Sequence, residues 1–559
     1  MLIHSFLLAS TLSLAVSGVS ATAAADSAEF FVPGRFIVEY QPELTKRSTL
    51  TASNPHEDFH QALAAIHPAG GVRSHFNYSS PLFTGASFSI HDSPDAIARL
   101  KSLPNVLNIW PVKRFDVLQT DATDMKQTSH AFGERNWNPH AHTGVAELHS
   151  KGLSGQNITI AIIDTGVDYT HPALGGGIGP GHKIVGGYNF VGPLSGTSSN
   201  NKTGPSNSQI DQYNPLDCQG HGTHVAGIIA AKDDQNIVGV APNATIRAYK
   251  IFGCSGGTSE DIVIAALQTA FRDGADIITA SVGLSGQGLL DGPANLIASR
   301  LVEYGVFVSI AAGNSGIEGP RYPSSPGAGE YVTAVGSAES NAILTWNATA
   351  HSSSGESITF KYSTARGVLP NISDTTFPVD FLADNADDCT ALAAHAANGS
   401  ALLLPLSSAC ENAKLYTAAQ NNGYKVVLRY TDNPLKYSVP TYSVQGFSID
   451  VFGIAADLGA WARNQTKAGH NLTISLDTLA AQPGVIEADT PRYVSEFSTW
   501  GPHFENGLFY PALVAPGGSI LSTWLDGRYS IMSGSSMATP YVCTFSQFFL
   551  DTISTNPFF

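Results

Sequence analysis

The sequence predicts an α/β protein whose main sheet is parallel and covered by helices on both faces. Between about residues 140 and 337, strand-like apolar runs alternate with helical stretches, which is the pattern of parallel strands joined by crossover helices. Residues 26–118 follow a separate β-α-β-β-α-β order, the split βαβ pattern. Residues 341–492 break the alternation with short mixed strands, so we expect an inserted mixed α/β domain there.

Composition and charge exclude several classes of protein. The chain has 559 residues, 43% of them hydrophobic, which is enough for a substantial core. It carries 29 Lys and Arg against 45 Asp and Glu, a net charge of −16, and no basic stripe suited to a phosphate backbone. After the first twenty residues, no apolar run approaches the ~18 residues needed to span a bilayer. We therefore expect no nucleic-acid partner and no membrane attachment once the N-terminal segment is removed.

The N-terminus indicates secretion. A short apolar stretch from Leu7 to Val16 precedes the small-residue triplet Ala21-Thr22-Ala23, which is typical of a signal peptide and its cleavage site. We assign residues 1–25 to this signal and expect an extracellular protein. Nine Asn-x-Ser/Thr triplets are consistent with a secreted glycoprotein. These triplets begin at Asn77, Asn157, Asn201, Asn243, Asn347, Asn371, Asn398, Asn464 and Asn471.

The unit at residues 26–118 is predicted from alternation and helical spacing. Arg35–Tyr40 alternates like a half-buried strand, and Phe59, Leu63 and Ile66 recur at helical spacing. Ser93-Pro94-Asp95 opens a second helix that ends before Pro104. The expected elements are strands at 35–40, 72–78, 83–90 and from 108 onward, with helices at 56–66 and from 93.

The parallel sheet is predicted from buried apolar runs. Ile158–Ile163 is continuously apolar, as a strand buried on both faces should be. Similar runs follow at 245–250, 276–281 and 306–310. A helix is expected from Ser259 to Asp273, with Asp261 available for capping and Gly274 after its end. In such sheets, functional residues gather at the carboxyl ends of the strands.

Five cysteines suggest two disulfides and one remaining thiol. Cys389 and Cys410 lie close in the sequence, inside the inserted domain, and we expect them to pair. Cys218 and Cys254 flank two segments that we expect to lie near one site, which makes them a second candidate pair. Cys543 is left over.

Three polar residues stand where chemistry could occur. Asp164 ends the first buried strand, His221 lies between glycines at the start of a small-residue helix, and Ser536 precedes a helix that Pro540 helps to begin. Each alone has a plainer reading: a strand-end Asp is commonly a turn or cap residue. His221 and His224 resemble a pair of metal ligands, but no zincin-like carboxylate accompanies them, so we expect no metal.

Together these segments resemble the signature segments of the subtilisin-like serine proteases, in that family's order Asp, His, Ser. The matching segments are Asp164-Thr165-Gly166, Gly220–His224, Ala311–Gly316 and Gly534–Pro540. The resemblance covers about residues 140–340 and 493–542 and implies the large secreted type. It implies a catalytic domain at 119–340 and 493–559, to which Phe497–Pro502 marks the return. Residues 26–118 then resemble a ferredoxin-like inhibitory propeptide, and 341–492 a protease-associated domain.

The resemblance also implies roles. Ser536 would be the nucleophile, His221 the general base and acid, and Asp164 the residue that orients the imidazole. Asn314 would donate to the oxyanion. The segment Ser281-Val282-Gly283 would bind substrate as an added β-strand. The implied protein is a secreted serine endopeptidase, made as a zymogen, with protein or peptide substrates and its own propeptide as inhibitor. It requires no cofactor; a structural calcium ion fits the resemblance, but no sequence pattern indicates one.

Two alternatives remain. Gly253–Gly257 fits the Gly-x-Ser-x-Gly nucleophile elbow of esterases around Ser255, although we interpret it as a loop near the substrate cleft. After Val542 the chain places phenylalanines where the family packs small residues, which would overfill a dense core. The second alternative is therefore an inactive or unstable truncated product that acts at most as a peptide-binding module.

Overall fold

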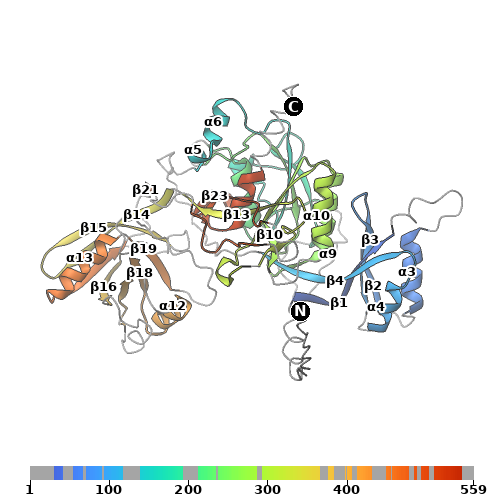
Figure 1. The fold of residues 1–559 in the computed structure, drawn as a ribbon. Helices are drawn as coiled ribbons and strands as arrows, with labels where there is room; N and C mark the ends of the chain where they lie inside the picture. Colours follow the sequence, from blue (N-terminus) through green and yellow to red (C-terminus); the bar gives the residue numbers. More distant parts are fainter. Residues whose placement is uncertain are drawn as a thin grey trace, which may run out of the picture.

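The computed structural model describes three units in a row: an N-terminal unit, a central unit and an inserted unit (Figure 1). The described residues are 30–41, 54–66, 71–90, 94–117, 139–192, 212–233, 237–285, 292–320, 322–340, 342–364, 375–382, 397, 399–405, 412–430, 449–454, 456–476, 484–487, 493–502 and 509–543. The expected signal peptide at 1–25, the pair Cys389 and Cys410, and the segment after Cys543 lie outside these ranges.

The N-terminal unit is a four-stranded antiparallel sheet with two helices, in the order that the sequence predicts. Its elements are β1 (Phe31–Tyr40), α3 (Pro55–Ile66), β2 (Val72–Ser79), β3 (Thr84–Ile90), α4 (Pro94–Lys101) and β4 (Val106–Val117). The strands lie in the order β4-β1-β3-β2. Phe59 and Leu63, one helical turn apart on α3, are fully buried against Phe88 and Leu100. Strand β4 runs beyond the unit, to Val117.

The central unit contains the parallel sheet, which confirms the predicted fold class. Seven parallel strands lie in the order β22-β13-β11-β9-β5-β7-β6. They are β5 (Thr159–Asp164), β6 (Ile184–Asn189), β7 (Thr245–Lys250), β9 (Ile277–Ala280), β11 (Phe307–Ala311), β13 (Thr333–Glu339) and β22 (Leu513–Gly518). The larger helices are α8 (His221–Ala230), α9 (Glu260–Arg272) and α10 (Pro293–Glu303), with a further helix at 535–543.

Alternate side chains of β5 face two different cores. Ile160 and Ile162 pack with residues of α8 and of the helix at 535–543. Ala161 and Ile163 pack with residues of α9 and α10 on the other face. A strand buried on both faces must be apolar throughout, which is why the run at 158–163 is a strong signal in the sequence.

Shorter elements complete the central unit. They are α5 (His140–Thr143), α6 (Val145–Ser150), η2 (Pro172–Leu174), β8 (Thr258–Ser259), β10 (Val282–Ser285), η3 (Gly316–Glu318), β12 (Ser324–Ser325), β23 (Ile520–Thr523), η4 (Leu525–Gly527) and β24 (Tyr529–Met532). Strands β23 and β24 form a hairpin, and β10 pairs with β12.

The inserted unit has its own sheet and one core of its own, and its second core also includes residues of the central unit, such as Leu521 and Ile531. Its elements are β14 (Ala342–Ser352), β15 (Ser357–Thr364), β16 (Thr375–Phe381), β17 (Ala401–Pro405), α12 (Asn412–Asn421), β18 (Val426–Tyr430), β19 (Asp450–Ile454), α13 (Ala456–Lys467), β20 (Leu472–Leu476) and β21 (Gly484–Glu487). Its ends meet at the central sheet, where the Ser495 N–H donates to the Ser337 carbonyl at 2.9 Å. The inserted unit therefore leaves the central unit and returns to it at neighbouring positions of the sheet.

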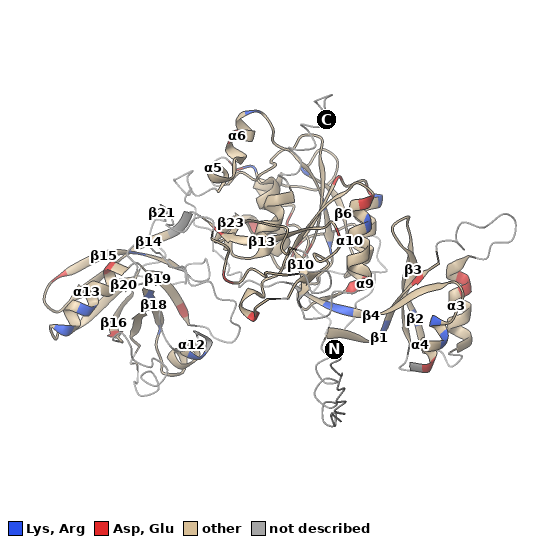
Figure 2. Ribbon diagram, viewed as in Figure 1, with Lys and Arg blue, Asp and Glu red and all other residues tan. Residues whose placement is uncertain are grey.

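Strand β4 joins the N-terminal unit to the central unit. It pairs antiparallel with β10, where Val117 lies opposite Val282 and Asp116 opposite Gly283. On its other side it pairs with β8, where Arg114 lies opposite Ser259. Figure 2 shows the basic stretch of β4 in blue where the strand reaches the central unit. The last strand of the N-terminal unit thus lies between two short strands of the central unit.

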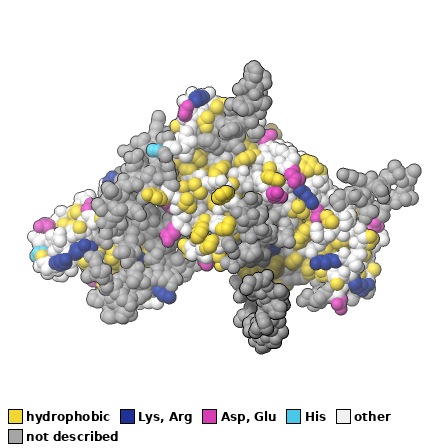
Figure 3. Space-filling view, viewed as in Figure 1, with side chains coloured by type: hydrophobic (Ala, Val, Ile, Leu, Met, Phe, Trp, Pro, Cys, Tyr) yellow, Lys and Arg dark blue, Asp and Glu magenta, His cyan; other side chains and the backbone are white. Residues whose placement is uncertain are grey.

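The surface has few charges. On the face in Figure 3, hydrophobic side chains gather over the central unit. Within the described ranges, no helix is both long enough and apolar enough to cross a membrane. The same ranges contain no group of three or more His, Cys, Asp or Glu side chains that could hold a metal ion. Six asparagines of the Asn-x-Ser/Thr triplets are described and all are exposed: Asn77, Asn157, Asn243, Asn347, Asn464 and Asn471.

Candidate active site

Asp164 and His221 meet at the carboxyl end of the parallel sheet. Asp164 is the last residue of β5, and His221 is the first residue of α8. Both are buried, and His221 Nδ1 lies 2.7 Å from Asp164 Oδ1. The carboxylate accepts this hydrogen bond and therefore fixes the imidazole with Nε2 on its other side.

The turn after Asp164 holds this pair in place. The Thr165 N–H donates to Asp164 Oδ1 at 2.7 Å, and Thr165 Oγ1 accepts from the Gly222 N–H at 2.8 Å. A Cβ at position 222 would lie 2.1 Å from the Gly166 carbonyl oxygen and 3.1 Å from the Asp164 side chain. Only glycine allows α8 to approach β5 this closely.

The charges around His221 raise the pKa of its imidazole. Burial alone would lower the pKa of His221, but the charge and hydrogen bond of Asp164, with the charge of Asp217, raise it above its usual value. Asp217 is buried and accepts hydrogen bonds from the N–H and Oγ1 of Thr223, in the first turn of α8. His221 Nε2 is buried and has no hydrogen-bond partner among the described residues.

Ser536 lies in the first turn of the helix at 535–543. The prediction that Ser536 precedes this helix and that Pro540 helps to begin it was wrong, because the helix begins at Ser535 and Pro540 is its sixth residue. Its Oγ donates to the Ser281 carbonyl at 3.3 Å, and the Ser281 hydroxyl donates to the Ser536 carbonyl at 2.8 Å. Ser536 is fully buried. The Ser536 hydroxyl is therefore bonded to the Ser281 carbonyl and not to His221 Nε2 in this structure.

Asn314 presents a buried amide donor beside this helix. Its Oδ1 accepts from both the N–H and the hydroxyl of Ser535, each at 2.9 Å. These bonds fix which way the amide faces. They leave Asn314 Nδ2 buried without a partner in the described part of the chain. A donor held in this way is suited to charge that develops on a substrate oxygen.

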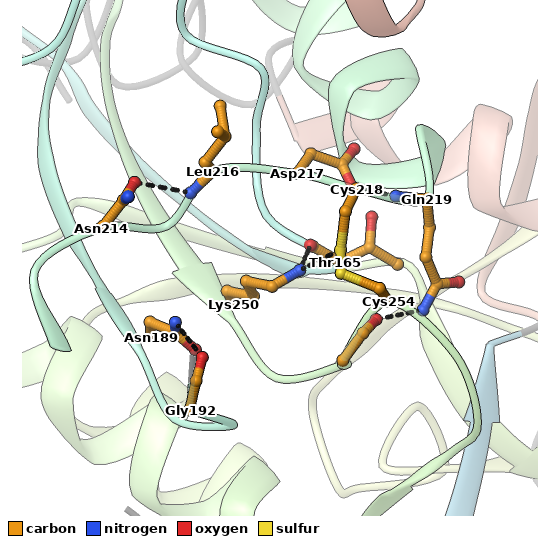
Figure 4. Close-up of a disulfide and its surroundings, with 11 residues drawn as sticks. Thr165, Asn189, Gly192, Asn214, Leu216, Asp217, Cys218, Gln219, Lys250 and Cys254 are labelled. Atoms are coloured by element: carbon orange, nitrogen blue, oxygen red, sulfur yellow. Dashed lines mark hydrogen bonds between the residues drawn. A yellow bond between two sulfur atoms is a disulfide. The ribbon is translucent and has the colours of Figure 1, made fainter. Parts of the chain in front are cut away.

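Cys218 and Cys254 form a disulfide, as expected for the second candidate pair (Figure 4). It ties the segment before His221 to the loop between β7 and β8. Gln219 Nε2 also donates to the Gly253 carbonyl across these segments. Ser255 is exposed on this loop. Cys543 is a buried thiol whose Sγ lies 3.2 Å from the Pro540 carbonyl oxygen.

Sequence reasoning missed three residues around the pair Asp164–His221. They are Thr165, Asp217 and Lys250, which surround the carboxylate and the start of α8. Thr165 stands inside a segment used for the resemblance, and Asp217 stands four residues before His221. Lys250 carried one signal, because it is a charged residue at the end of a strand that lies beside β5.

Comparisons with known proteins identify the family. The model of the subtilase family matches residues 155–549, and the chain belongs to this family. It is 27% identical over 487 residues to the minor extracellular protease Vpr of Bacillus subtilis, covering 82% of this chain and 54% of that protein. It is 36% identical over 200 residues to the major intracellular serine protease of the same species, and the match covers 34% of this chain and 54% of that protein. The chain thus spans about half the length of these relatives.

A solved structure was also found, that of fervidolysin from Fervidobacterium pennivorans, a keratinolytic enzyme related to subtilisin. It is 18% identical, with a TM-score of 0.48, and the match covers 95% of this chain and 56% of that one.

Proposed function

We propose that the protein is a secreted serine endopeptidase, made as a zymogen, in which Ser536, His221 and Asp164 act as a catalytic triad. Family membership supports the chemical class. The observation that carries the assignment is the hydrogen-bonded pair of His221 and Asp164 at 2.7 Å, with the outer nitrogen Nε2 buried and unpartnered among the described residues. An imidazole held in this way is ready to accept a proton from a nucleophile.

In the proposed reaction, Ser536 Oγ attacks the scissile carbonyl while His221 Nε2 takes its proton. The imidazolium is stabilised by Asp164, which does not itself take the proton. The Asn314 amide and the Ser536 N–H donate to the oxyanion of the tetrahedral intermediate. His221 then returns the proton to the leaving amine, and a water molecule hydrolyses the acyl-enzyme by the same steps.

The substrate is proposed to bind as a β-strand along Ser281-Val282-Gly283. The support is that β4 already pairs with Val282 and Gly283 on this edge and with β8 on the other. Main-chain pairing of this kind binds a peptide with little demand on its sequence. We infer that β4 occupies the substrate position and that the N-terminal unit inhibits the enzyme from which it is cut.

Two further features support the zymogen interpretation. Phe115 of β4 is fully buried in the core that α9 and α10 share, so the strand is anchored in the central unit. Its direction brings the end of β4 toward Ser281, which bonds Ser536. We expect self-cleavage shortly after Val117, within residues 118–135. N-terminal sequencing of the mature protein tests this, and a mature chain that begins before Phe36 would contradict it.

Secretion and glycosylation are part of the proposal. The support is the apolar N-terminal stretch of the sequence, the disulfide, and the exposure of every described asparagine in an Asn-x-Ser/Thr triplet. The relative Vpr is described as extracellular. We propose that the inserted unit acts as a protease-associated domain that screens protein substrates.

The test of the triad compares two serines after an added protease has removed residues 26–118 from every variant, because a variant without the nucleophile cannot process itself. Ser536→Ala should abolish hydrolysis of a small peptide substrate, whereas Ser255→Ala, in the Gly-x-Ser-x-Gly loop, should leave it within about twofold. Activity that survives Ser536→Ala but disappears in Ser255→Ala would overturn the proposal in favour of the esterase-like alternative.

A further inference from the structure

A lysine is buried beside the candidate triad. Lys250 ends β7 with 1% of its surface exposed, and the sheet register places it directly beside Asp164 of β5. Its Nζ donates to the Thr165 carbonyl at 2.5 Å and lies 3.5 Å from Cys218 Sγ (Figure 4). The disulfide of Cys218 and Cys254 thus lies against the ammonium group.

Thr165 links this lysine to both candidate residues. Its carbonyl accepts from Lys250, its N–H donates to Asp164 Oδ1, and its Oγ1 accepts from the Gly222 N–H in the first turn of α8. One residue therefore connects Lys250, the carboxylate and the helix that begins at His221. Loss of the Lys250 contact would free the turn that sets the spacing of the pair.

Lys250 and His221 are influenced by the same two carboxylates, those of Asp164 and Asp217. Burial lowers the pKa of Lys250, while the charges of Asp217 and Asp164 oppose that effect. The same two carboxylates raise the pKa of His221, and the buried His224 faces His221 from one turn further along α8. Two carboxylates, one ammonium group and a second imidazole therefore act on the His221 ring.

A lysine at this position has a cost that packing does not explain. Removing an ammonium group from water is expensive, and an apolar side chain at the end of a buried strand is often neutral or stabilising instead. Other strands of the same sheet end in small apolar residues, β9 at Ala280 and β11 at Ala311, so a cation is not a general requirement at this edge of the sheet. The cation serves the groups that it touches.

We propose that Lys250 is a positioning residue of the triad, which holds the turn at Asp164 and Thr165 against α8 and balances the charge of Asp217. This inference rests on the proposed function. Without the ammonium group, His221 would face two uncompensated carboxylates, which favour its protonated form. A base must be neutral to accept a proton, so the activity of such a variant would be lost at a higher pH than in the wild type.

Three substitutions separate anchoring from charge. Lys250→Met removes the donor and the charge, Lys250→Gln keeps a donor for the Thr165 carbonyl without the charge, and Lys250→Arg keeps both. Lys183→Met is the matched control, because Lys183 is also partly buried and donates to a backbone carbonyl, that of Pro242, away from the triad.

The measurement is the pH dependence of kcat/KM for a small peptide, using processed enzyme from the full chain. Lys250→Gln and Lys250→Met should raise the midpoint of the acid limb by about one pH unit. Lys250→Met should also lower kcat, by about tenfold or more, because the turn is freed. Lys250→Arg and Lys183→Met should keep the wild-type midpoint. Circular dichroism checks the folding of each variant, and Lys250→Gln carries the test if Lys250→Met does not fold.

A second readout does not depend on catalysis. In the Ser536→Ala background, an NMR titration of the His221 ring should show the same upward shift in Lys250→Gln. An unchanged midpoint in both measurements, with or without a lower kcat, would overturn the proposal and leave Lys250 a structural residue. Failure of the triad itself would appear separately, as wild-type activity that survives Ser536→Ala.

Discussion

The contact between the N-terminal unit and the central unit contains a buried ion pair. Arg35 Nη2 lies 2.6 Å from Asp261 Oδ2, and the two side chains are 3% and 0% exposed. Arg35 belongs to β1, and Asp261 lies in the first turn of α9. The Asp261 carboxylate also accepts from the hydroxyls of Ser87, in the N-terminal unit, and Ser259, at the start of α9.

Removing the cation should weaken inhibition strongly. In Arg35→Met, the buried side chain of Asp261 loses its cationic partner while the units are in contact, but it can be hydrated once they separate. Breaking one side of a buried ion pair costs about 3–5 kcal/mol. That cost falls on the inhibited state alone, so the inhibition constant of residues 26–118 should rise by about 10²- to 4 × 10³-fold.

The assay measures inhibition of the processed enzyme by residues 26–118, with the wild-type unit, Arg35→Met and Arg73→Met. Arg73 is exposed on β2 of the same unit and serves as the control, with an expected change within about threefold. Circular dichroism shows whether each unit is folded. A folded Arg35→Met unit that inhibits as strongly as the wild type would show that the ion pair between Arg35 and Asp261 does not stabilise the inhibited state.

Three other predictions follow from the site and the units. Asn314→Leu should lower kcat by about 10²–10³ with little change in KM; a loss below tenfold in steady-state kinetics would remove Asn314 from the oxyanion hole. Burial and the charge of Arg35 lower the pKa of His75 to about 4. The neutral ring therefore costs the inhibited state nothing above pH 6.5, and the inhibited state loses stability as the pH falls from 6.5 toward 4. At pH 5, the His75→Gln zymogen should therefore convert more slowly than the wild type, whereas at pH 7.5 the two should convert at similar rates. Equal rates of conversion in variant and wild type at pH 5 would contradict this. Replacing residues 345–492 by a short linker should change the preference among protein substrates more than the turnover of a small peptide; a folded deletion variant that cannot hydrolyse the peptide would place the inserted unit in the active site.

The sequence predicts the parallel sheet well because β5 is buried on both faces and must be apolar along its whole length. It also predicts Asp164 and His221 at one end of that sheet, since each stands at the end or start of an element. These signals are local. Arg35 and Asp261 give no such signal, because they are more than two hundred residues apart and the sequence offers Asp261 only as a helix-capping residue.

The partners of individual polar atoms could not be predicted. The sequence suggests that Ser536 bonds His221, whereas its Oγ donates to the Ser281 carbonyl, in a site where β4 pairs with the adjacent strand. Likewise, strand β4 was expected from residue 108 onward, but its extension between β8 and β10 depends on edges that only the folded central unit provides. The position of Lys250 beside Asp164 could not be predicted either, since it depends on the register between β5 and β7.

Ser536 is the proposed nucleophile, on which the whole proposed reaction depends. The most direct measurement is the mass of the processed enzyme after reaction with a fluorophosphonate, followed by peptide mapping of the modified residue. One adduct per chain should form, on Ser536, and it should be absent from the His221→Ala variant, which lacks the base and from which an added protease has removed residues 26–118. An adduct on Ser255, or full labelling of Ser536 in the absence of His221, would contradict the account.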